Sequence, residues 1–220
     1  MLRVLSFCML SVCLLITGCG RNCCDTALYQ SSGVAKPVVA VLPVIDRTES
    51  QHLGWDLSQE FTQEIQRRLF GSSKLYFLRS NLSKSVALAL NVKDPKFITK
   101  ADTESLGAAE FAIVTELLEQ TEKCYMHPSQ KHEVLGGVGG KFMAALRLRV
   151  LDLRGDQPKV ILQEVIDAER MIPWHCYDEG YETVRWKQGE FDLTPMGLLH
   201  QDLVDAIIAR TEGYVGVAKG

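Results

Sequence analysis

Apolar and polar positions alternate with two different periods along this chain, and the change between them divides the sequence. Residues 38–45 form a continuous apolar run, which is typical of a strand buried on both faces. Residues 56–70 place apolar side chains four apart from Leu57 to Leu69, and this spacing predicts an amphipathic helix. Strands and helices continue to alternate along the chain, with a strand expected at 75–79, a helix carrying Val86, Ala87 and Leu90, and a short helix at 100–106.

After residue 110 the period changes to two, which predicts strands. The clearest alternation runs from Phe142 to Val150, where apolar residues alternate with Arg147 and Arg149. Strands are also expected at 111–122 and 160–172, followed by an irregular loop at 173–194 and a terminal helix at 195–211.

This order is strand, helix, strand, helix, then a three-strand meander and a C-terminal helix. Early crossover connections predict parallel neighbours, whereas a meander predicts antiparallel ones. We therefore expect an α+β fold with an α/β start and a mixed sheet of about five strands. Residues 37–220 should form this single globular domain.

The first 18 residues have the pattern of a lipoprotein signal peptide. Arg3 gives the N-terminal region a positive charge, and residues 4–16 carry no charge. The small residues Thr17 and Gly18 then precede Cys19. The apolar run is shorter than the ~20 residues that a spanning helix needs. We expect lipidation at Cys19, with an ordinary secretory signal or an uncleaved anchor as the alternatives.

A tether should connect this lipid to the domain. Residues 19–36 are polar and have no periodicity, so we expect a lipidated, disordered segment. Gly20 follows the cysteine where many inner-membrane lipoproteins carry Asp, which favours the outer membrane. The domain would then lie in the periplasm.

Residues 40–69 resemble a superfamily of periplasmic domains that includes LpoB, CsgG and the N-terminal domain of TolB. The resemblance lies in a strand ending at Leu42-Pro43, a polar loop with Leu53-Gly54, and a helix that starts Leu57-Ser58-Gln59-Glu60-Phe61. It implies a sheet covered by helices and supplies no catalytic residues. The doubled cysteines also resemble those of chlamydial envelope lipoproteins.

Composition excludes several classes of partner. The net charge is −3 and no basic stripe exists, so a nucleic-acid partner is not expected. The run Gly136, Gly137, Val138, Gly139, Gly140 and Lys141 is glycine-rich, but a nucleotide-binding loop needs glycine and Ser or Thr where Leu135 and Phe142 stand. We expect a hairpin tip there, with no nucleotide and no cofactor.

Cys124 and Cys176 follow two strands that run in the same direction. A disulfide between them is the first expectation, because an exported chain meets an oxidising compartment. A disulfide is difficult to form directly across an intervening strand, so two unpaired thiols are the second expectation. A metal site in which His127, His132 and His175 join the two cysteines as ligands is the third expectation, because the residues lack the compact spacing of metal-binding motifs.

Aromatic residues gather in the loop at 173–194. They either cap the core or anchor a partner, because Tyr and Trp dominate binding hot spots. Together with the glycine-rich tip they form our candidate partner-binding surface: Trp174, Tyr177, Tyr181, Trp186, Gly136, Gly137, Gly139 and Gly140.

No catalytic motif is present, so we do not expect an enzyme. The expected function is that of a non-catalytic protein-binding accessory or scaffold at the cell envelope, regulating wall synthesis or export. A subunit of an oligomeric secretion pore and a metal-dependent or hydrolytic envelope enzyme are the alternatives.

Overall fold

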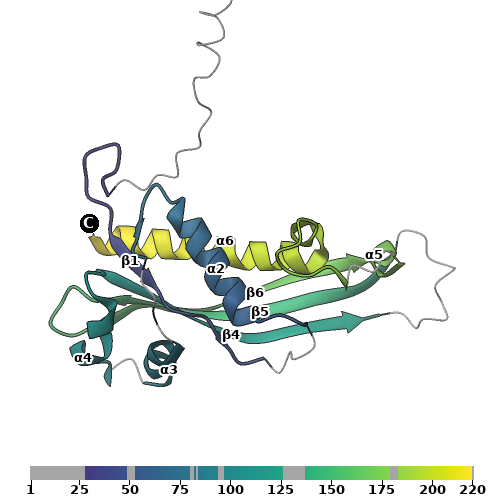
Figure 1. Ribbon diagram of the computed structural model, residues 1–220, viewed down its shortest axis with the longest axis horizontal. Helices are drawn as coiled ribbons and strands as arrows, with labels where there is room; N and C mark the ends of the chain where they lie inside the picture. Colours follow the sequence, from purple (N-terminus) through teal and green to yellow (C-terminus); the bar gives the residue numbers. More distant parts are fainter. Residues whose placement is uncertain are drawn as a thin grey trace, which may run out of the picture.

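The computed structural model describes residues 28–48, 53–79, 82, 84–93, 97–125, 137–178 and 183–219. At its centre lies a mixed six-stranded sheet in the order β3-β1-β4-β5-β6, with β2 paired to β4 (Figure 1). The strands are β1 (Val38–Val41), β2 (Ile45–Asp46), β3 (Tyr76–Phe77), β4 (Phe111–Cys124), β5 (Val138–Asp152) and β6 (Lys159–Pro173). The helices are α2 (Leu57–Phe70), α3 (Lys84–Val92), α4 (Lys100–Thr103), α5 (Trp174–Asp178) and α6 (Pro195–Lys219), with 3₁₀ turns η2 (Glu104–Leu106) and η5 (Phe191–Leu193).

The expected change from parallel to antiparallel pairing is confirmed. β1 pairs in parallel with β3 and β4, whereas β4, β5 and β6 pair antiparallel. The first apolar run is divided into β1 and β2 at Pro43, which has no N–H to donate to a neighbouring strand. Side chains of α2 form the hydrogen bonds that the backbone of Val44 needs beside this proline. Val44 N donates to Thr62 Oγ1 at 2.8 Å, and Ser58 Oγ donates to Val44 O at 2.5 Å.

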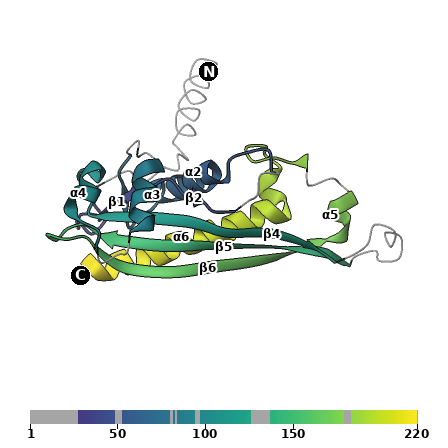
Figure 2. The ribbon, with the colours of Figure 1, turned by 90° about the horizontal axis from the view of Figure 1, so that it is seen from below.

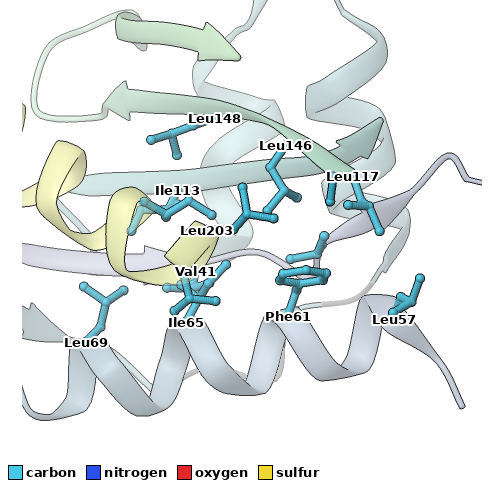
Figure 3. Packing of buried hydrophobic residues seen from close by; sticks show 14 of the residues in the cluster. Val41, Leu57, Phe61, Ile65, Leu69, Ile113, Leu117, Leu146, Leu148 and Leu203 are labelled. Atoms are coloured by element: carbon cyan, nitrogen blue, oxygen red, sulfur yellow. The ribbon is translucent and has the colours of Figure 1, made fainter. Parts of the chain in front are cut away.

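One face of the sheet, called the inner face below, is covered by α2 and α6. α2 points its apolar stripe at β1 and β4, and Leu203 of α6 packs on the same core (Figure 3). Asp56 caps α2 by accepting from Gln59 N, and Gly71 ends it. The side chains at the centre of this core are fully buried: Val41, Leu57, Phe61, Ile65, Leu69, Ile113, Leu117, Leu146, Leu148 and Leu203.

The opposite, outer face is covered over only part of its length. α3, α4 and η2 bury Leu90 and Leu106 against Ala112, Val114 and Leu151. β4, β5 and β6 run on beyond these helices toward α5, and no described helix covers the outer face there (Figure 2). We call the α5 end of the molecule the distal end.

α6 is longer than the sequence pattern indicated. The expected end was residue 211, but the helix continues to Lys219 through Gly213 and Gly216. Val215 is fully buried, so packing on the sheet outweighs the low helix propensity of glycine. Within the ranges described, no helix has both the length and the apolar character required to cross a bilayer.

Candidate functional site

The expected glycine-rich tip is partly inside the sheet. Gly139 and Gly140 belong to β5, where Gly140 lies opposite Cys124 of β4 and Ile172 of β6. Gly137 O accepts a hydrogen bond from Trp174 N at 2.9 Å. The structure therefore brings the segment before β5 and the start of α5 together, while Gly136 lies outside the described residues.

The aromatic residues of the candidate surface are divided between two places. Trp174 starts α5 at the distal end, and only 7% of its surface is exposed. Trp186 instead lies against a pocket between α2 and α6. Tyr177 belongs to α5, although its side chain is not described, and Tyr181 lies outside the described residues.

Cys124 and Cys176 are both thiols in the structure, so it does not contain the expected disulfide. The register gives the reason, because β5 lies between β4, which ends at Cys124, and β6, which leads to Cys176. Next-nearest strands are about 9.6 Å apart, beyond the reach of a direct bridge. Among the described residues no group of three or more potential metal ligands occurs, and His127 and His132 lie outside them.

The pocket between α2 and α6 contains a buried carboxylate–histidine pair that the sequence analysis missed. Glu60 Oε1 lies 2.5 Å from His200 Nδ1, and Trp55 Nε1 donates to Glu60 Oε2 at 2.7 Å. Glu60 is only 1% exposed and His200 only 3%. Each carboxylate oxygen therefore has a ring nitrogen as its hydrogen-bond partner, His200 Nδ1 for Oε1 and Trp55 Nε1 for Oε2.

The second ring nitrogen of His200 has no hydrogen-bond partner among the described residues. The pocket beside it is lined also by Arg68, Trp186, Phe191 and Gln201. Its volume is about 10 Å³, which is close to the space that one water molecule needs. An unsatisfied buried nitrogen is costly, so a bound water or small polar group would be stabilised here.

A carboxylate that orients a histidine also occurs in catalytic sites. The described lining of this pocket includes no Ser, Thr, Cys or Lys that could act as a nucleophile. The signal in the sequence was a polar residue beside each apolar stripe, with Glu60 next to Phe61 and His200 next to Leu199. Spacing could not show that the two residues meet, because they are 140 positions apart.

A second candidate site lies on the uncovered outer face. Tyr125, Val138 and Met171 are exposed there at the distal end, and we call these three residues the distal patch. Tyr125 N donates to Gly139 O at 2.9 Å, and Val138 pairs with Pro173, two residues after Met171. The three side chains therefore come from adjacent segments of one surface.

Charged side chains border the distal patch. Lys141 lies opposite Met171 in the register, and Lys141 Nζ donates to Glu169 Oε2 at 2.7 Å. This hydrogen bond raises the pKa of the Lys141 ammonium, so Lys141 stays charged at neutral pH. An apolar centre with a charged rim is the arrangement found in protein–protein interfaces.

Comparisons with known proteins identify the family but not an activity. The solved structure of the hypothetical protein CT253 from Chlamydia trachomatis is 38% identical to this chain, with a TM-score of 0.68. The match covers 82% of this chain and 98% of that one. No curated protein matches the chain.

Two other solved structures are more distant. Lipoprotein GNA1162 from Neisseria meningitidis is 8% identical over 61% of this chain and 83% of that one, with a TM-score of 0.37. A PelC dodecamer from Paraburkholderia phytofirmans is 11% identical over 79% of this chain and 86% of that one, with a TM-score of 0.39. Similarities this low carry no argument about function.

The expected resemblance to LpoB, CsgG and TolB is not confirmed by these matches and stays a prediction, although a chlamydial relative is found. The model of a family described as "Family of unknown function (DUF7499)" matches residues 25–219, a range that includes every residue the structure describes. The chain therefore belongs to DUF7499, a protein family of unknown function.

Proposed function

We propose that this protein is a lipoprotein, anchored through Cys19 to the periplasmic side of the outer membrane, that binds an envelope protein without catalysing a reaction. The lipid anchor is supported by the apolar leader and by the small residues before Cys19. In this role the domain is an accessory or scaffold for the machinery of wall synthesis or export.

The distal patch is the observation that carries this proposal. Soluble monomers rarely expose large contiguous apolar surfaces, and those that do often use them for binding. Val138 and Met171 lie in strands of the sheet, and Tyr125 directly follows β4. A partner would therefore meet residues held by the sheet, with little loss of conformational freedom. The partner should carry a complementary apolar surface, with charges facing Lys141 and Glu169.

Photo-crosslinking in intact cells tests the partner. We place a photoreactive phenylalanine analogue at Met171, which is 50% exposed, and at Leu193 of η5 as a control that is 78% exposed. A protein adduct should form from Met171 and not from Leu193. Val138→Lys should then reduce the yield of that adduct without unfolding the domain. Equal adducts from both positions, or none from Met171, would contradict the proposal.

Metabolic labelling with a palmitate analogue tests the anchor separately. Label should appear on the wild-type protein and be absent from Cys19→Ala. An unlabelled wild-type chain that retains residues 1–18 would exclude lipidation while leaving the binding surface to be judged by crosslinking.

A hydrolytic enzyme is the second candidate, and the Glu60–His200 pair beside a water-sized cavity is the observation that favours it. In that role His200 would act as the general base on a water molecule, oriented by Glu60. Purified wild-type protein that hydrolyses ester or amide substrates, with activity lost in His200→Gln, would favour this candidate over the binding protein.

A further inference from the structure

The segment before β1 forms a small hairpin that is fixed to the end of α6. Tyr29 and Ala35 form an antiparallel bridge, and Gln30 N donates to Val34 O at 2.8 Å. Lys219 Nζ donates to Ala35 O at 2.8 Å, which connects the hairpin to the last turn of α6. The hairpin therefore lies beside the C-terminus, at the end of the molecule opposite α5 (Figure 1).

Apolar side chains are exposed at this end of the molecule. They come from both the hairpin and the last turns of α6, and we call them the hairpin-end patch: Leu28, Tyr29, Val34, Tyr214 and Val217. Tyrosine carries an apolar ring with a polar tip, and this combination prefers the boundary between water and lipid. The aliphatic members would enter the acyl region just below it.

The length of chain before the hairpin indicates what covers the hairpin-end patch. Leu28 is nine residues after Cys19, so even a fully extended connection spans about 30 Å. β5 contains 15 residues and is about 50 Å long. An anchor at Cys19 thus keeps the hairpin end next to the bilayer, whereas the distal patch at the far end of β5 points away from it.

The charges at this end favour apolar insertion over attraction to anionic lipid. Lys219 Nζ lies 3.6 Å from Glu110 Oε2, and Lys74 Nζ lies 3.1 Å from Glu212 Oε2. Each of these cations is thus neutralised by a carboxylate. A lipid surface that bound them would have to compete with an existing ion pair.

We propose that the hairpin-end patch docks on the bilayer surface, giving the domain a second membrane contact and one fixed orientation. This inference rests on the proposed lipidation of Cys19. The docked domain stands with β4, β5 and β6 directed away from the membrane and presents the distal patch to its partner.

Quenching of tryptophan emission by brominated lipid tests the docking. The full lipidated chain carrying Tyr29→Trp is reconstituted in phosphatidylcholine vesicles with or without bromine on the acyl chains. Tyr125→Trp is the matched control, because Tyr29 is 58% exposed and Tyr125 is 53% exposed. The wild-type chain gives the background of Trp55, Trp174 and Trp186, none of which lies in the hairpin-end patch.

The emission added by Tyr29→Trp should be largely lost with brominated lipid, while that added by Tyr125→Trp should persist. Val217→Trp should behave like Tyr29→Trp, and quenching should not change when anionic lipid or salt is added. Suppose that the intact mass shows acylation. Equal quenching at both tyrosine positions, or no quenching at Tyr29→Trp, then overturns the docking but leaves the anchor in place. An intact mass without acyl chains overturns the anchor and the docking together.

Discussion

Replacing His200 by phenylalanine should test whether the buried Glu60–His200 pair stabilises the contact between α2 and α6. The substitution leaves Glu60 Oε1 buried without the ring nitrogen that now lies 2.5 Å away. Phenylalanine should fit the site, because the His200 ring already packs on Phe61 with a centroid distance of 4.7 Å. The perturbation therefore removes a hydrogen bond while leaving the packing largely intact.

The expected loss of unfolding free energy follows from burial. Removing one partner of a buried hydrogen bond leaves the other unsatisfied and costs about 1–3 kcal/mol, and Glu60 is almost completely inaccessible to water. Replacing both partners by apolar residues, as in Glu60→Leu with His200→Phe, leaves neither group of the pair buried without a hydrogen bond. The double variant should be more stable than His200→Phe, with a residual loss of about 1 kcal/mol because Trp55 Nε1 then has no acceptor.

Urea denaturation at pH 7, followed by tryptophan emission, measures both values. Trp55 donates to Glu60, so its emission should also shift in either variant. A loss below about 1 kcal/mol in His200→Phe would refute the reasoning, since a buried group left without its hydrogen-bond partner costs at least that much. A double variant less stable than His200→Phe would refute it as well.

Two further predictions concern stability. Gly197→Ala in α6 should cost about 2 kcal/mol or more, because the new Cβ would lie 2.0 Å from the backbone oxygen of Phe191. Gly213→Ala in the same helix meets nothing within 4 Å and should stabilise by about 0.5–1 kcal/mol in the same urea titration; the opposite signs are the test. The hydrogen bond from Lys93 lowers the pKa of Asp102 from 3.8 to about 2, so its contribution to stability is complete above about pH 4 and is lost as the pH falls through about 2. The melting temperature of Asp102→Asn should thus be lower than that of wild type at pH 6, and the difference should shrink as the pH falls from 4 to 2; a constant difference would contradict the assignment.

Much of the fold could be predicted from the spacing of apolar residues. The helix at 56–70 and the strands from Phe111 to Ile172 are where the two periods indicated, because a half-buried helix or strand must repeat its apolar side chains with its own period. Errors occurred at ends and short elements. The strand expected at 75–79 contains only Tyr76 and Phe77, and α6 runs eight residues further than expected.

The candidate sites were less predictable. Trp174 and Trp186 are close in sequence but occupy different places, because α5 and η5 divide what the pattern presented as one irregular loop. Gly139 and Gly140 are strand residues, since β5 begins before them. In each case the local sequence shows the residue type but not which segment it faces.

By itself the sequence determined the order of helices and strands and the change from parallel to antiparallel pairing, because these depend on neighbouring residues and local periodicity. Only the tertiary structure decided that Glu60 meets His200, that no described helix covers the distal part of the outer face, and that the hairpin and the distal patch lie at opposite ends. Those contacts join residues far apart in the chain. Their free energy depends on burial and geometry that no local pattern records.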